Sequence, residues 1–254
     1  MIKILHSFFK KNKTAISILE KITGSKIHTS LPLGLDPILD IQYSMPQYLF
    51  NTIMDVGANT GQSENYFNKT LPGVDIFCFE PVTETYLELK KNIKGINTKA
   101  YNIGLGSETF KTNVKIDKNH YCSDTFSLNQ KEHSDYKEYF MQEVSVETLS
   151  DFFRNNSLSN ISLLKIDTEG YDLEVLKGSL DLLSNDKIDF INVEVSMNKF
   201  NSFHVSFEDV NNFLATYNYS IFGIYDQIHD FKIKKPILRR VNVMYVSNSV
   251  SQIE

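Results

Sequence analysis

The chain has 254 residues, of which 41% are hydrophobic and 22% are charged, as in a folded globular protein with a sizeable core. Its formal net charge of −5 argues against a nucleic-acid-binding protein, because a protein that binds the phosphate backbone needs a dense basic face. The two cysteines, Cys78 and Cys122, are too few for a disulfide framework and indicate a reducing compartment. No apolar run approaches the roughly 20 residues that span a bilayer. We therefore expect a soluble, cytoplasmic protein.

Residues 1–50 differ from the rest because they carry six lysines against three acidic residues. Apolar side chains recur there on one face of a helix that Gly24 can end. They are Ile2, Leu5, Phe9, Ile16, Leu19 and Ile22. This pattern predicts an N-terminal helical extension, residues 1–50, ahead of a single domain, residues 51–254. The helix either packs on that domain or makes a peripheral contact with an anionic membrane surface.

From residue 52 onward, predicted strands and helices alternate, as in a mostly parallel sheet covered on both faces. The first three strands are expected at Thr52–Val56, Asp75–Phe79 and Lys99–Leu105, with helices over 62–71 and around 86–93. The rhythm then changes, and Phe110–Ile116, Thr125–Leu128 and Glu143–Val146 predict a small insertion of short strands. A helix that Thr148 caps follows this insertion.

The alternation resumes with apolar strands at Ile161–Ile166 and Phe190–Val195. Leucines 173, 176, 180 and 183 predict one helix between them, and Ser206 caps another helix after the second strand. Ser220–Tyr225 and Val241–Val246 lie close together without a helical pattern between them, which predicts a terminal antiparallel pair.

The strongest local signal is the run Asp55-Val-Gly57-Ala58-Asn59-Thr-Gly61, in which a strand enters a glycine turn before a helix. Such a turn permits close approach of a ligand to the backbone, and the helix start favours an anion. A dinucleotide site requires the spacing G-x-G-x-x-G, but Asn59 replaces the middle glycine. The turn therefore fits S-adenosylmethionine better than a nicotinamide cofactor.

Glu80 ends the second predicted strand, where a carboxylate can accept hydrogen bonds from both hydroxyls of a ribose. Because S-adenosylmethionine and NAD present the same diol, Glu80 does not separate them. An NAD(P)-dependent reductase therefore stays open as an alternative, as does a catalytically silent partner protein with the same fold.

Three segments resemble the FkbM family of S-adenosylmethionine-dependent methyltransferases: the glycine turn, Phe79-Glu-Pro81, and the run from Leu164 to Gly178 that contains Lys-Ile-Asp-Thr-Glu-Gly. The resemblance implies an α/β, Rossmann-like class I methyltransferase fold with a mostly parallel seven-stranded sheet. It also implies O-methylation of hydroxyls on sugars, glycolipids or secondary metabolites, with a small-molecule or carbohydrate acceptor as partner. The implied cofactor-binding residues are Asp55, Gly57, Ala58, Asn59, Gly61, Glu80, Pro81 and Gly104.

Methyl transfer to a hydroxyl requires a group that removes the proton, and this group should follow the fourth or fifth strand. Asp167 and Glu169 follow the fourth strand, Glu194 ends the fifth, and His204 lies in the loop after it. The resemblance makes Asp167 the first candidate base. Acidic residues here would equally cap a helix. The three carboxylates suit Mg²⁺, but spacing alone does not show that they converge, and no metal is predicted.

A basic run, Lys232, Lys234, Lys235, Arg239 and Arg240, surrounds Pro236 between the last two predicted strands. It is typical of a solvated turn between edge strands. The alternative is contact with a phosphate-bearing or lipid-linked substrate. Neither the acceptor nor the oligomeric state follows from the sequence.

Overall fold

The structure, a computed structural model, describes residues 21, 33–117, 139–229 and 237–252. The predicted apolar face of residues 2–22, the strand at Thr125–Leu128 and the lysines of the basic run lie outside the described residues. The boundary between an extension and a domain at residue 50 stays a prediction. No helix within the described ranges is long and apolar enough to cross a membrane.

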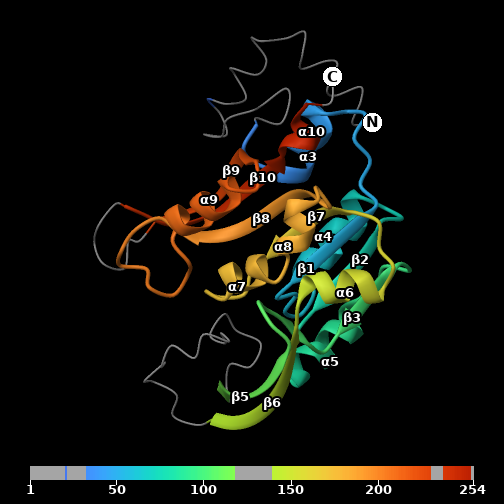
Figure 1. Cartoon of the computed structure of the whole chain (residues 1–254), viewed down its shortest axis with the longest axis vertical. Coiled ribbons are helices and arrows are strands. Elements are labelled where there is room, and N and C mark those ends of the chain that lie inside the picture. Colours follow the sequence, from blue (N-terminus) through green and yellow to red (C-terminus); the bar gives the residue numbers. More distant parts are fainter. Residues whose placement is uncertain (1–20, 22–32, 118–138, 230–236, 253–254) are drawn as a thin grey trace.

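The main sheet has seven strands in the order β3-β2-β1-β7-β8-β10-β9 (Figure 1). Their bounds are β1 Thr52–Val56, β2 Asp75–Phe79, β3 Thr98–Tyr101, β7 Ile161–Ile166, β8 Ile188–Ser196, β9 Tyr219–His229 and β10 Leu238–Ser247. All neighbouring strands are parallel except for β10, which is antiparallel to both β8 and β9. The predicted mostly parallel sheet with a terminal antiparallel pair is confirmed.

Helices cover both faces of this sheet, because its buried strands carry apolar side chains on alternate faces. In β1, Met54 and Val56 pack toward one face and Ile53 packs toward the other. The first face is covered by α6 (Leu149–Asn155), α7 (Asp172–Lys177), α8 (Leu180–Ser184) and α9 (Phe207–Ala215). The second face is covered by α3 (Pro37–Ser44), α4 (Gln62–Thr70), α5 (Thr83–Asn92) and α10 (Asn248–Ser251).

Helix α3 ties residues 37–44 to the sheet. Asp36 caps its first turn by accepting hydrogen bonds from two backbone N–H groups, and Pro37 occupies the first helical position. Ile38 and Ile41 are fully buried in the core on the α4 side of the sheet. The Tyr225 hydroxyl of β9 donates to the Asp40 carboxylate at 3.0 Å. This segment is therefore packed on the domain.

The predicted third strand, Lys99–Leu105, is wrong as a single element. The structure divides it into β3 of the main sheet and β4 (Gly104–Leu105), which belongs to a separate three-stranded sheet with the order β4-β6-β5. Its other strands are β5 (Phe110–Asp117) and β6 (Tyr139–Glu147), which extend away from the main sheet (Figure 1). Asn102 marks the break because its amide donates to the carbonyls of Glu80 and Pro81.

The single helix predicted from leucines 173 to 183 is also wrong, because α7 ends before Gly178 and α8 begins at Leu180. The cause is a tertiary contact that helical periodicity does not reveal. A Cβ atom on Gly178 would lie 1.9 Å from the Gly106 carbonyl oxygen, and the Gly178 carbonyl accepts a hydrogen bond from the Ser150 N–H. The chain bends at Gly178 to permit this close backbone approach.

The glycine turn after β1 packs directly on the end of β7. Gly57 has a φ of +77°, and a Cβ atom there would lie 2.0 Å from the Asp167 carbonyl oxygen. The Asp167 N–H donates to the Val56 carbonyl at 3.0 Å. From the sequence, the close approach at Gly57 was expected to be that of a ligand. In the structure the backbone of Asp167 makes this approach.

We predict that Gly57→Ala destabilises the fold far more than Gly73→Ala. Gly73 also has a positive φ, of +92°, but no atom lies within 4 Å of the position its Cβ would take. The control should therefore lose only the backbone preference, about 1–2 kcal/mol. Gly57→Ala should lose a further ~2 kcal/mol through overpacking. Urea unfolding measures both, and equal losses would contradict the contact with Asp167.

Candidate active site

The turn after β1 and the end of β2 form one buried polar corner. Asn59 lies in the left-handed region with a φ of 48°, and its N–H donates to Glu80 Oε2 at 3.1 Å. The N–H of Val82 donates to the other carboxylate oxygen at 2.9 Å. Burial raises the pKa of Glu80 to about 7, although these two N–H groups oppose the rise. The corner holds a carboxylate in one fixed orientation.

This corner fits a nucleoside. The side-chain oxygen Oδ1 of Asn59 is buried and has no hydrogen-bond partner among the described residues, so it is available to a ligand. Glu80 is only 6% exposed, and each of its oxygens accepts one backbone hydrogen bond while retaining further acceptor capacity. Gly61 adopts a φ of 95° at the start of α4, as the predicted glycine turn requires.

Asp55 has an internal partner in the structure. Its carboxylate is fully buried, with Lys165 Nζ at 3.1 Å from Oδ1, and the same ammonium lies 3.4 Å from Asp167 Oδ2. Burial raises the pKa of Asp55, and the charge of Lys165 partly offsets that effect. Lys165 therefore holds the ends of β1 and β7 together. The sequence analysis did not single it out, although a lysine inside an apolar strand is a recognisable signal.

Asp172 caps the turn after β7. Capping was the alternative to a catalytic role that the sequence left open for the acidic residues after the fourth strand. Asp172 is buried, and its two carboxylate oxygens accept hydrogen bonds from Thr168 N and Gly170 N, both at 3.0 Å. Between them Glu169 is held in the left-handed region with a φ of 54°, a conformation that costs a non-glycine residue free energy. Asp172 thus fixes the turn and leaves Asp167 and Glu169 without that task.

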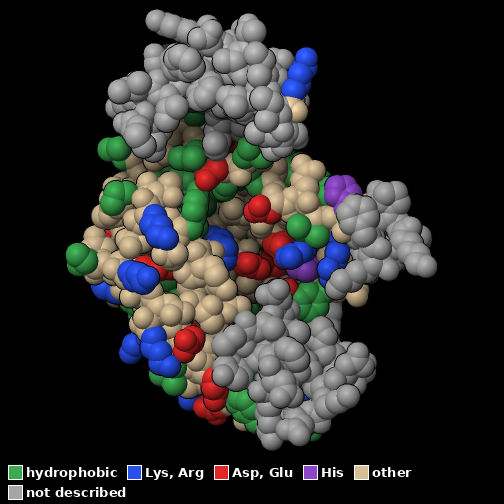
Figure 2. Space-filling view, turned by 180° about the vertical axis from the view of Figure 1, so that it is seen from behind, with side chains coloured by type: hydrophobic (Ala, Val, Ile, Leu, Met, Phe, Trp, Pro, Cys, Tyr) green, Lys and Arg blue, Asp and Glu red, His purple; other side chains and the backbone are tan. Residues whose placement is uncertain are grey.

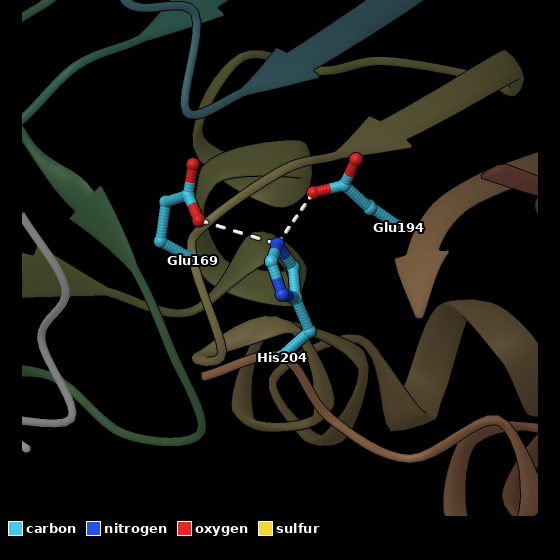
Figure 3. Close-up of side chains that lie close together, drawn as sticks. All are labelled: Glu169, Glu194 and His204. Atoms are coloured by element: carbon cyan, nitrogen blue, oxygen red, sulfur yellow. Dashed lines mark ion pairs between the residues drawn. The ribbon is translucent and has the colours of Figure 1, made fainter. Parts of the chain in front are cut away.

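Three of the predicted site residues converge (Figure 3). His204 Nε2 lies 2.6 Å from Glu194 Oε2 and 3.3 Å from Glu169 Oε2. The guanidinium of Arg240 contacts the other oxygen of Glu194. Burial alone lowers the pKa of His204, but the two carboxylates reverse this effect and raise it to about 9. The last two parallel strands of the sheet and the loops after them thus meet at one buried cluster.

Burial has opposite outcomes for the two glutamates of this cluster. Burial raises the pKa of Glu169 to about 7, although His204 opposes the rise. Burial also tends to raise the pKa of Glu194, but His204 and Arg240 outweigh it and leave the pKa below its usual value. Glu194 is therefore the more firmly ionised of the two.

The remaining predicted residues are more dispersed. Asp167 pairs with Lys165, whereas the carboxylates that pair with His204 are those of Glu169 and Glu194. Pro81 contributes its carbonyl to Asn102, and Ala58 is buried with its N–H on the Phe79 carbonyl. Gly104 lies in β4 of the small sheet. Their roles in cofactor binding stay predictions. Figure 2 shows a face of the molecule on which acidic, basic and histidine side chains gather beside a hollow.

The sheet order, the glycine turn after β1 and the carboxylate that ends β2 define a class I methyltransferase fold. The chain belongs to the FkbM methyltransferase family, whose domain model, described as "Methyltransferase FkbM domain", matches residues 55–221. Membership of this family supports S-adenosylmethionine as the cosubstrate.

Two curated fungal relatives match part of the chain. Methyltransferase 1 of Beauveria bassiana is 32% identical over 58% of this chain and 65% of its own length. Methyltransferase sdnD of Sordaria araneosa is 32% identical over 50% of this chain and 59% of its own length. The chain thus spans about three fifths of these relatives. Among solved structures, the N-terminal domain of human METTL16 with SAH matches at 14% identity and a TM-score of 0.46, over 91% of this chain and 79% of that one.

We predict that affinity for S-adenosylhomocysteine rises about tenfold between pH 6 and pH 8. The pKa of Glu80 is raised to about 7, so its ionised form, which accepts ribose hydroxyls, predominates only above that value. Calorimetric titration measures the change. Glu80→Gln should bind weakly and lose this pH dependence, whereas Glu84→Gln, an exposed control on α5, should retain it. A pH-independent affinity in the unmodified protein would contradict the assignment.

We predict that Lys165→Met costs about 3–5 kcal/mol of unfolding free energy, because it strands the buried Asp55 carboxylate. The double variant Asp55→Asn/Lys165→Met should recover part of that loss. Lys91→Met removes an exposed pair with Glu88 and should cost less than about 1 kcal/mol. Chemical unfolding of the unmodified protein, Asp55→Asn, Lys165→Met and the double variant gives the coupling, and additive losses would show that the two side chains do not interact.

Proposed function

We propose that this chain is an O-methyltransferase that methylates a hydroxyl group on a sugar, a glycan or glycolipid, or a secondary metabolite. The observation that carries the proposal is the position of Asp167. Its backbone packs on Gly57 of the cofactor turn, and its carboxylate is paired with Lys165 yet remains 38% exposed. A carboxylate beside the donor and open to solvent suits the removal of a proton from an alcohol.

The residues of the chain act mainly by position. Glu80 and the turn at Asn59 orient the donor, and Lys165 keeps Asp167 at the edge of the sheet. When bound, S-adenosylmethionine supplies a methyl group that forms a bond to the acceptor oxygen as its bond to sulfur breaks, with the electron pair remaining on sulfur. Asp167 accepts the hydroxyl proton. Glu194 and His204 are buried against each other, whereas Asp167 is open to solvent, which favours Asp167 as the base.

Two other functions have less support. An NAD(P)-dependent reductase is disfavoured by the family to which the chain belongs and by Asn59 in the turn. An enzyme that methylates a nucleic-acid base is disfavoured because β7 is followed by Asp167-Thr-Glu169 rather than by an Asn/Asp-Pro-Pro-Tyr/Phe run, and because the net charge is −5. The buried free thiol of Cys78 supports a cytoplasmic location.

The function is tested by transfer of labelled methyl from S-adenosylmethionine into small-molecule and glycolipid fractions of the source cell. We expect a labelled product that survives mild alkali, because a methyl ether resists the treatment that hydrolyses a methyl ester. Mass spectrometry then identifies the acceptor. Label confined to carboxyl esters or amines would overturn the proposal. Tight donor binding without any labelled product would favour the catalytically silent alternative.

We predict that Asp167→Asn lowers turnover by about a hundredfold or more while affinity for S-adenosylhomocysteine changes little. The amide keeps the shape of the carboxylate but cannot accept the proton. Asp181→Asn replaces an exposed carboxylate of α8 and should leave turnover unchanged. Single-turnover kinetics and calorimetry measure the two quantities. Normal turnover in Asp167→Asn would assign the base to another residue.

A further inference from the structure

The cluster of Glu169, Glu194 and His204 has the composition of a metal site. One carboxylate oxygen from each glutamate and His204 Nε2 lie within 4.8 Å of one another (Figure 3). Glu194 and His204 are each only 6% exposed. Although the three atoms are close, none of them has a hydrogen-bond partner of good geometry within the described part of the chain. Their shared neighbourhood is therefore incompletely satisfied.

Neighbouring residues orient two of these atoms from outside. Asn201 is buried, and its amide lies against His204 Nδ1, with Nδ2 at 3.0 Å and Oδ1 at 3.2 Å. In the tautomer with the proton on Nδ1, the Nδ1–H group donates a hydrogen bond to Asn201 Oδ1, and the lone pair of Nε2 is free to bind a cation. Arg240 contacts Glu194 Oε1 and leaves Oε2 facing the cluster. Metal-binding histidines and carboxylates characteristically have such outer partners.

The charges at this edge of the sheet leave room for a cation. The carboxylates of Asp55, Asp167, Glu169 and Glu194 lie there, and that of Asp172 lies in the same turn. Two permanently charged bases, Lys165 and Arg240, face them. Carboxylates thus outnumber these two bases, and His204 Nε2 and the two glutamate oxygens share either a proton or a cation in its place. Because an uncompensated buried charge is costly, a divalent ion can take the position of that proton.

We propose that Glu169, Glu194 and His204 bind one divalent cation through two carboxylate oxygens and one imidazole nitrogen. This mixed donor set suits Mn²⁺ better than Mg²⁺, since Mg²⁺ prefers oxygen ligands alone. Three protein ligands leave positions open for water and for a substrate oxygen, as in catalytic metal sites. The sequence pattern suggested only that Asp167, Glu169 and Glu194 suit Mg²⁺, and no metal was predicted from it; the proposed ligand set has His204 in place of Asp167.

The role of the ion rests on the proposed function. A hydroxyl oxygen of the acceptor occupies an open position on the cation, which lowers the pKa of the hydroxyl. Its proton passes to Asp167, and the oxygen is then the nucleophile for the methyl group. No oxidant or further reactant is needed. The ion would thus make the acceptor hydroxyl more acidic, and Asp167 would remove its proton.

Metal binding is tested on the full chain after treatment with a chelator and desalting, with Mn²⁺ as the probe. We expect calorimetry and the loss of the free-Mn²⁺ spin resonance signal to show one ion per chain. Mn²⁺ should bind at least about tenfold more tightly than Mg²⁺. It should also raise the unfolding temperature of the unmodified chain, because a ligand of the native state stabilises it. Absence of binding to well-folded protein would overturn the proposal.

Variants locate the site. Glu169→Gln and His204→Ala should abolish measurable Mn²⁺ binding, and Asn201→Ala should weaken it about tenfold or more by releasing the imidazole. Glu208→Gln, an exposed residue of α9, should bind as the unmodified chain does. Circular dichroism checks that each variant is folded. Unchanged affinity in folded Glu169→Gln and His204→Ala would place the ion elsewhere and overturn the assignment.

The outcomes separate this proposal from the proposed function. Full methyl transfer in the presence of a chelator, together with no bound Mn²⁺, would refute the metal site and keep the methyltransferase. Mn²⁺ bound at the cluster without methyl transfer to any hydroxyl would keep the site and refute the function. For a catalytic ion we expect methyl transfer to fall at least about tenfold with chelator and to return on addition of Mn²⁺.

Discussion

The architecture of the candidate active site, at the carboxyl ends of the parallel strands, depends on the contact between the turn after β1 and the end of β7. The backbone of Asp167 approaches Gly57 so closely that a methyl group could not be accommodated, and Lys165 joins the carboxylates of Asp55 and Asp167. A buried ammonium between two carboxylates is stable only if its geometry is kept. The donor turn and the candidate base are therefore fixed relative to each other before any ligand binds.

Most strands of the main sheet follow from the sequence because each is a short apolar run bounded by turn residues, and burial on both faces leaves little ambiguity. The errors occurred where a tertiary contact overrides local pattern. The Asn102 amide donates hydrogen bonds to the Glu80 and Pro81 carbonyls, and the chain leaves the main sheet at this residue. Gly178 interrupts the helix predicted from the leucine spacing, because its backbone packs on that of Gly106. Neither contact is visible in the periodicity of its own segment.

In the candidate site, too, some features follow from local sequence and others depend on tertiary contacts. The order of Asp55, Gly57 and Glu80 along the chain indicates a nucleoside corner, because strand ends of a parallel sheet meet at one edge. The order of residues along the chain does not show which polar side chains converge after β7. Asp172 and Glu169 belong to one acidic run, yet the first caps backbone N–H groups while the second points toward His204. The left-handed backbone conformation of Glu169 directs the two side chains to these different partners.

The reversed strand explains how a basic side chain reaches this edge. In a sheet of parallel strands the residues that end each strand gather at one edge, whereas β10 runs the opposite way and presents its beginning there. Arg240, near the start of β10, is paired in register with Ser196 at the end of β8 and contacts Glu194. The terminal antiparallel hairpin thus supplies a cation that balances a buried carboxylate, and it leaves one oxygen of that carboxylate directed at His204.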